Sequence, residues 1–219
     1  MSGARAHLIL VAFAAWLIVP KLAAAQVEPS AEVQAALDRQ QERAQRRERG
    51  LGPFQEELRP LAEAGEPVAQ FLLGTMLVGP DPVTAIPYLT RSAEKGCAGS
   101  AGLLAVYSWA TGKGGGEEWL EHAISGGDAA SMFVRATMHV RGAEGFEKST
   151  AEALAWAELA RARSYSRGLT PEIERMIDAL RSGATPDEAA AAATRFEALD
   201  GQFPKKPFYV CGQSVPSEG

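Results

Sequence analysis

The sequence predicts an all-α protein built from stacked helix hairpins, and three observations support this fold class. Apolar residues make up 46% of the 219-residue chain, enough for a buried core, whereas aromatic residues make up only 7%. Alanine, which is the best helix former and a poor strand former, is abundant throughout the chain. A segment also recurs about every 30 residues, and a period of roughly 20–50 residues is typical of repeat architectures.

The N-terminal segment, positions 1–25, has the order of a secretory signal peptide. Arg5 gives a basic start, Leu8 to Val19 is an uncharged apolar stretch, and Ala23 to Ala25 offers small residues before Gln26. We predict cleavage after Ala25 and a periplasmic or secreted protein. The stretch is shorter than the roughly 20 residues of a membrane-spanning helix, so no stable membrane span is expected after cleavage, and an uncleaved anchor is the alternative.

The predicted mature chain is acidic. Removing residues 1–25 takes away Arg5 and Lys21 but no acid, which lowers the net charge from −5 to −7. This charge argues against nucleic acid or an anionic membrane as the main partner. Within segment 26–52, Ser30 is suited to cap a helix, and five arginines are mixed with three acids between Asp38 and Arg49. We expect a charged helical arm there, exposed or mobile, and regard binding of an anionic partner as the less favoured alternative.

The repeat follows Pro53. Its template is the run from Gly65 to Gly74, and similar runs begin at Gly96 and at Gly126. Each run has a small residue four positions after the glycine and is followed by apolar residues at helical spacings, one of them an aromatic residue. Each unit is therefore predicted to be two antiparallel helices. A single hairpin cannot bury its apolar face alone, so the hairpins should stack. The small residues are Ala69, Ser100 and Ala130, and the aromatic residues are Tyr88, Trp119 and Trp156.

The runs LAEAGEPVAQFLLG and AIPYLTRSAEKG and the loop ATGKGGG resemble Sel-one-like repeats, which are relatives of the tetratricopeptide repeat. The resemblance covers residues 53–165, with two departures: Gly115 replaces the usual helix alanine and Arg135 stands where glycine is expected. It implies a short right-handed α/α solenoid of about three hairpins that serves as an adaptor between proteins, often in bacterial envelopes.

The first helix of each hairpin is expected to line a binding face for a protein or peptide partner. From the spacing we place Gln70, Phe71, Tyr107 and Arg135 on this face.

Two further helices are predicted after the repeats. Thr170-Pro171-Glu172 and Thr185-Pro186-Asp187 each combine an N-cap, a proline at the first helical position and an acid in the first turn. The helices should run near 171–182 and 186–199, and the segment 166–200 should cap the solenoid. The tail, residues 201–219, is rich in proline and glycine and is predicted to be extended.

Cys97 and Cys211 are the two cysteines of the chain, and an exported compartment permits them to pair. We expect one disulfide that ties the tail to the second repeat, with two separate thiols as the alternative. A bridge that closes so long a loop stabilises by roughly 2–5 kcal/mol.

The sequence shows no complete catalytic or metal-binding constellation. Residues 98–102, Ala-Gly-Ser100-Ala-Gly, resemble a nucleophile elbow, but they are predicted within a helix, whereas the elbow needs a strand before its serine. The loop around Lys113 lacks the flanking residues of a phosphate loop. His122 and His139 fall on different predicted helices, and Glu117, Glu118 and Glu121 are acids near a helix start, where acids are favoured.

We therefore expect a binding scaffold without catalytic residues, cofactor or metal. The alternative is an envelope hydrolase of the β-lactam-binding type, because some exported cysteine-rich members of the repeat family are associated with that activity. Those members carry a cysteine pair in each repeat, whereas the repeats here contain Cys97 alone.

Overall fold

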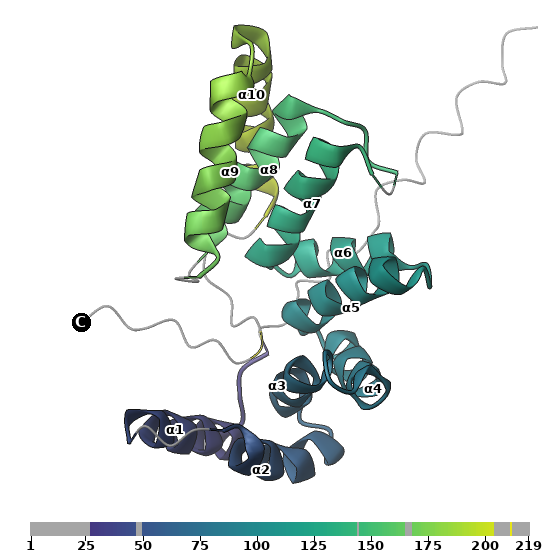
Figure 1. Ribbon diagram of the computed structural model, residues 1–219, viewed down its shortest axis with the longest axis vertical. Coiled ribbons are helices and arrows are strands. Elements are labelled where there is room, and N and C mark those ends of the chain that lie inside the picture. Colours follow the sequence, from purple (N-terminus) through teal and green to yellow (C-terminus); the bar gives the residue numbers. More distant parts are fainter. Residues whose placement is uncertain (1–26, 47–49, 144, 165–167, 204–210, 212–219) are drawn as a thin grey trace, which may run out of the picture.

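A computed structural model describes residues 27–46, 50–143, 145–164, 168–203 and 211, and every regular element in these ranges is a helix (Figure 1). The helices, in chain order, are α1 (Ala31–Gln45), α2 (Gly52–Glu63), α3 (Pro67–Leu77), α4 (Pro82–Glu94), α5 (Ala98–Thr111), α6 (Gly116–Ser125), α7 (Ala129–Arg141), α8 (Thr150–Arg163), α9 (Thr170–Gly183) and α10 (Pro186–Gln202).

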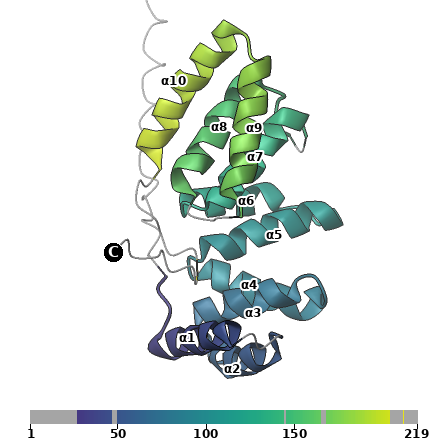
Figure 2. The same ribbon diagram turned by 60° about the vertical axis from the view of Figure 1, so that its left-hand side comes forward.

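The helices pair in chain order and the pairs stack. α3 packs on α4, α5 on α6 and α7 on α8, and the first helices of neighbouring pairs also touch, α3 with α5 and α5 with α7. Figures 1 and 2 show the pairs following one another along the long axis of the molecule. The prediction of an all-α stack of helix hairpins is confirmed, and α1 with α2 adds a further hairpin before the first predicted one.

Glycines with positive φ mark the start of each unit. Gly65, Gly96 and Gly127 have φ values of 93°, 93° and 86°, a conformation that favours glycine. The amide after each glycine donates to the carbonyl five residues earlier: Glu66 to Leu61 (3.0 Å), Cys97 to Ser92 (3.1 Å) and Asp128 to Ala123 (3.0 Å). These bonds end one helix and turn the chain into the next.

This pattern corrects the third predicted unit by one position. The unit begins at Gly127 and not at Gly126, whose φ is −79°, so the steps from Gly65 to Gly96 and from Gly96 to Gly127 are equal. Ser131 therefore matches Ala69 and Ser100, and like them it is buried, whereas Ala130 is exposed. In the same register Ala136 matches Gly74, while Arg135 matches the core residues Leu73 and Leu104.

Close packing between helices also depends on two glycines. A Cβ atom on Gly74 would lie 2.7 Å from the side chain of Leu89, and one on Gly126 would lie 2.5 Å from the Cβ of Ala98. Both distances are far below van der Waals contact, so α3 and α4, and the end of α6 and the start of α5, approach more closely than alanine would allow. The second helices supply the larger side chains, with Leu58, Leu89 and Leu120 fully buried at equal intervals along the chain.

Segment 26–52 contains the packed helix α1. Ser30 caps it as expected, accepting a hydrogen bond from the amide of Val33 (3.3 Å). Val33 and Ala36 are fully buried against α2 and α3 residues, and Glu57 of α2 pairs with Arg39 and Arg43 at 3.0 and 2.8 Å. The sparse apolar residues are therefore enough to join α1 to the stack, so this helix is not free in solvent.

The helices predicted at 171–182 and 186–199 are α9 and α10, and both pack on α8 (Figure 2). Arg163 of α8 joins this cap, since its guanidinium is buried and pairs with Asp200 at 2.7 Å. Residues 201 and 202, which were predicted to belong to the extended tail, end α10 instead. Apart from Phe203 and Cys211, the rest of that tail lies outside the described residues.

A disulfide joins Cys97, directly before α5, to Cys211, and both residues are fully buried. Their Cα atoms are 5.6 Å apart and 114 positions separate them in sequence. The predicted pairing is thus present in the structure. The predicted signal peptide lies outside the described residues, and no helix among those described is long and apolar enough to cross a membrane.

Candidate partner-binding surfaces

The four residues predicted to form a binding face do not form one surface. Gln70 is only 1% exposed, and its amide donates to the carbonyl of Ala62 (3.0 Å), so a partner cannot reach it. Phe71 is half-buried against the core cluster that contains Leu89 and Leu104. Arg135 is paired with Glu121 and stacked on Trp156. Tyr107 is partly exposed and lies on a different face of the first helices from the other three residues.

That face carries nine residues that we call the apolar ladder. They recur at the repeat interval on α3, α5 and α7, are all partly or fully exposed, and comprise three columns: Leu72, Leu103 and Val134; Thr75, Val106 and Thr137; and Met76, Tyr107 and Met138. Because α5 contacts both α3 and α7, the members of each column lie on successive, contacting helices. The repeat spacing, once placed at the correct glycine, would have identified them from the sequence.

The ladder combines exposure with a rigid base. Val106 is 48% exposed, although it is a large apolar residue in the middle of the central helix. Leu72 packs against the core cluster that contains Leu58 and Leu73. Leu103 packs against the cluster that contains Leu89 and Leu104, and Val134 packs against the cluster that contains Leu120 and Trp156. The hydroxyls of Thr75 and Thr137 donate to carbonyls of their own helices at 2.8 and 3.0 Å. The polar groups in the ladder are thereby satisfied, and its surface presents mainly carbon.

Charged residues gather at the C-terminal ends of the ladder helices. Helices α3 and α5 contain no acidic or basic residue, and α7 contains only Arg135, His139 and Arg141. Lys113, directly after α5, places its ammonium 5.5 Å from the ring centroid of Tyr107. Lys113 and Arg141 are both exposed. The same turns also carry the exposed carboxylates of Asp81, Glu117, Glu118 and Glu147, so the C-terminal edge of the ladder has mixed charge.

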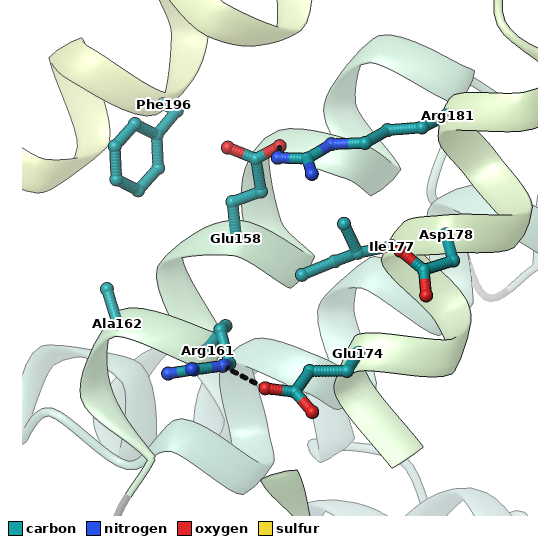
Figure 3. Close-up of a pocket in the computed structure, with 8 residues that line it drawn as sticks. All are labelled: Glu158, Arg161, Ala162, Glu174, Ile177, Asp178, Arg181 and Phe196. Carbon is teal, nitrogen blue, oxygen red and sulfur yellow. Dashed lines mark hydrogen bonds and ion pairs between the residues drawn. The ribbon is translucent and has the colours of Figure 1, made fainter. Parts of the chain in front are cut away.

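A second candidate surface is a groove of about 410 Å³ between the cap helices (Figure 3). Two ion pairs between α8 and α9 border it, Glu158 with Arg181 at 2.8 Å and Arg161 with Glu174 at 2.7 Å. Ala162, Ile177 and Phe196 supply apolar surface, and Asp178 adds a third carboxylate. Since both arginines already face carboxylates, the groove offers no strong anion site.

The serines that could suggest nucleophilic catalysis serve the packing. Ser100 is buried within α5 and its hydroxyl donates to the sulfur of Cys97 at 3.3 Å. Sequence reasoning missed a Ser-x-x-Lys spacing at Ser92 and Lys95, which is a serine-hydrolase signature. In the structure Ser92 is fully buried and donates to the carbonyl of Pro67 (2.7 Å), while Lys95 donates to the carbonyl of Gly65. Both groups thus join α4 to the start of α3.

The remaining candidate residues also have structural partners. His122 stacks on Trp119 with ring centroids 6.0 Å apart, and Nδ1 of His139 lies 2.9 Å from the carbonyl oxygen of Glu147. The described residues contain no group of three or more histidine, cysteine or acidic side chains that could hold a metal ion. The glycines around Lys113 form the loop from α5 to α6, and Gly115 caps α6 with a φ of 75°.

Asp128 is the N-cap of α7, and its carboxyl group is buried. Its carboxylate accepts hydrogen bonds from the amide of Ser131 (2.8 Å) and from the Ser131 hydroxyl. Burial raises the pKa of Asp128, and the two bonds from Ser131 only partly oppose this effect. The carboxyl lies between α5 and α7, since a Cβ atom on Gly102 would be 3.0 Å from its oxygen.

Comparisons with known proteins give a likeness to solved structures. No family model matches the chain, and no curated protein matches it. Among solved structures, it is similar to c5321, a protective antigen present in uropathogenic Escherichia coli strains and described as displaying an SLR fold, with 18% sequence identity and a TM-score of 0.45. The match covers 68% of this chain and 41% of that protein, so the chain spans less than half of its length.

Proposed function

We propose that this protein is an exported, non-catalytic scaffold that binds a protein or peptide partner through the apolar ladder. The observation that supports the proposal most is the recurrence of partly exposed, mainly apolar residues at the repeat interval on the contacting helices α3, α5 and α7. Stacked repeats create extended surfaces of this kind, and a contiguous exposed apolar patch on an otherwise polar surface is typical of an interaction site.

Two features of the chain support the proposed compartment. Residues 1–25 have the composition of a secretory signal peptide. The buried Cys97–Cys211 disulfide is a bond that persists in oxidising compartments. Together they favour the periplasm or the exterior of the cell.

A hydrolase function receives no comparable support. A serine nucleophile must be exposed to substrate and next to a base. Ser92 and Ser100 are both fully buried, and each donates its hydroxyl hydrogen to a structural partner.

The proposal can be tested by capture from the native cell envelope. Tagged full-length protein would be cross-linked in cells, purified and analysed by mass spectrometry, alongside the variants Val106→Glu and Val83→Glu. Val83 is a matched control because it is an 84% exposed valine on α4, outside the ladder.

We expect one or two dominant partners with the native protein and with Val83→Glu, and loss of these partners with Val106→Glu. Circular dichroism should show equal helicity in all three proteins. If Val106→Glu captures the same partners at the same level, the ladder is not the binding face. If no protein is enriched with the native chain, the scaffold function itself is contradicted.

A further inference from the structure

We propose that Cys97, in the reduced protein, is a thiolate nucleophile that attacks a disulfide donor and so begins formation of the bond to Cys211. This inference does not depend on the apolar ladder. It rests on three features at the start of α5: the position of Cys97 in the repeat, the hydrogen bond that its sulfur accepts and the place that Cys211 occupies.

Cys97 stands at a position that the neighbouring units fill with a carboxylate. The N-caps of α3, α5 and α7 are Glu66, Cys97 and Asp128, and the steps between them are equal. Glu66 and Asp128 accept hydrogen bonds from the amides of Ala69 and Ser131 respectively. The start of each first helix therefore presents partial positive charge to an anion at this point. The anionic form of cysteine is the thiolate, which a helix N-terminus favours.

A serine hydroxyl three positions after the cap occurs in both the second and the third unit. The hydroxyl of Ser131 donates a hydrogen bond to the carboxylate of Asp128. In the same way, the hydroxyl of Ser100 donates to the sulfur of Cys97 at 3.3 Å, and both serines are buried. A hydrogen bond to an ionised acceptor is stronger than one to a neutral acceptor. Ser100 therefore stabilises the thiolate of Cys97 more than the thiol.

The other charges around the start of α5 largely balance. Helix α5 packs on α3, α4, α6 and α7. Among the described residues, the charged and titratable groups at the ends of these helices that adjoin the start of α5 are Glu66, Arg91, Glu94, Lys95, His122 and Asp128. Burial raises the pKa of Asp128 and so favours its neutral form. Beside His122, two carboxylates and two cations remain, so the helix N-terminus and Ser100 determine which form of Cys97 is favoured.

The chemical step is a thiol–disulfide exchange with a disulfide-bearing oxidant of the exported compartment. The Cys97 thiolate attacks one sulfur of the donor, forms a mixed disulfide and releases the other donor sulfur as a thiolate. The Cys211 thiolate then attacks the Cys97 sulfur, which forms the observed bond and releases the second donor thiolate. The two thiol protons pass to the donor sulfurs, so the donor gains two electrons and the protein loses two. Because both cysteines are fully buried once bonded, the exchange belongs to the reduced chain, where the donor takes the place of Cys211.

The first test measures the thiolate directly. Since the chain contains two cysteines, Cys211→Ala leaves Cys97 as the single thiol and Cys97→Ala leaves Cys211. Ultraviolet absorbance of the thiolate would be recorded against pH, with and without urea, and circular dichroism would report the folding of each variant. We expect at least about threefold more thiolate at pH 7 for Cys97 than for Cys211, and loss of this difference in urea. Equal thiolate in the two folded variants overturns the proposal.

A second test retains both cysteines, so it stands even if Cys211→Ala fails to fold. Ser100→Ala introduces the residue that the first unit has at this position, Ala69, which is buried in the same way. Ser131→Ala is the matched control, because it removes the equivalent hydroxyl from the third unit. Reduced native protein and both variants would be mixed with oxidised glutathione at pH 7 and at about pH 9. Acid-quenched samples would be analysed for free thiols and by mass spectrometry.

We expect Ser100→Ala to form the bond about threefold more slowly than the native protein at pH 7, because its thiolate fraction is smaller. The difference should disappear at about pH 9, where the thiol is largely ionised in both proteins. Ser131→Ala should match the native protein at both pH values, and the first glutathione should be found on Cys97. A first glutathione on Cys211, an unchanged rate for Ser100→Ala at pH 7 or equal slowing by both serine substitutions would contradict the proposal.

Discussion

The guanidinium of Arg135 lies over the indole ring of Trp156, with its central carbon 4.7 Å from the ring centroid. In the register of the repeat, position 135 corresponds to Leu73 and Leu104, which are core residues of the first two units. Burial lowers the pKa of Arg135, and its Nε atom is buried with no hydrogen-bond partner among the described residues. The third unit thus places a cation where the other two place leucine.

Arg135→Leu should leave the free energy of unfolding unchanged or raise it by up to about 1 kcal/mol, because a well-packed apolar residue often replaces a buried ion at no cost. Trp156→Ala should lower it by about 3–5 kcal/mol through loss of a large buried ring. Urea denaturation followed by circular dichroism measures both. A loss above about 2 kcal/mol for Arg135→Leu would show that the stacked guanidinium makes a net stabilising contribution.

Reduction of the Cys97–Cys211 disulfide, or Cys211→Ala, should lower the free energy of unfolding by about 2–5 kcal/mol, because the bond restricts the unfolded chain. Cys97 occupies the cap position of α5 without a capping hydrogen bond, whereas Glu66 and Asp128 cap α3 and α7 at the equivalent position. Cys97→Ser combined with Cys211→Ala should therefore regain about 1 kcal/mol relative to Cys211→Ala. Calorimetry of the three proteins would reveal either effect, and identical transitions would refute both.

Stability should depend on pH through Asp128. Because burial raises its pKa in the folded state, its contribution is fully present below the unfolded pKa, near pH 4, and is lost as pH rises through the folded value. Asp128→Asn keeps a capping oxygen but cannot ionise. Urea denaturation at pH 4, 5, 6 and 7 should show the native protein losing stability relative to Asp128→Asn as pH increases. A difference that is constant with pH would contradict this.

Glycine substitutions should have opposite effects at two helix ends. Gly126→Ala would bring its Cβ to 2.5 Å from that of Ala98, so we expect a loss of about 1–3 kcal/mol from overpacking. Gly201 in α10 has no atom within 4 Å of an added Cβ, so Gly201→Ala should stabilise by about 0.5–1 kcal/mol. Thermal unfolding of the two variants provides the comparison, and equal shifts would show that the contact at Ala98 is not rigid.

The sequence was sufficient for the helices because local signals agree with the packing. Ser30 and Thr185 lie at the N-caps that their side chains predict, and the small residues Ala69 and Ser100 are buried between helices. The register of the third unit was not decided by local signals, since Gly126 and Gly127 are adjacent and either could have started it. An equal step of 31 residues from Gly65 to Gly96 and on to Gly127 would have selected Gly127, as the positive φ of that residue confirms.

The candidate site was harder to predict than the fold. Arg135 is charged and was placed on the proposed face, but in the corrected register it corresponds to the core residues Leu73 and Leu104 and lies over Trp156. Gln70 is polar, which suggested exposure, but its amide is used to join α3 to the carbonyl of Ala62 at the end of α2. Of the four predicted residues, only Tyr107 belongs to the apolar ladder.

The disulfide also divides the chain mechanically. A pulling force on the two ends would pass from Cys97 to Cys211 through the covalent bond, so residues 98–210 between them carry no tension. Only α1 to α4 lie on the loaded path before Cys97. An extended chain is at most about 3.6 Å long per residue, so the disulfide reduces the maximum end-to-end length of the unfolded chain by roughly 400 Å. Under load, the hairpins that carry Tyr107 and Met138 would stay folded after the first two had opened.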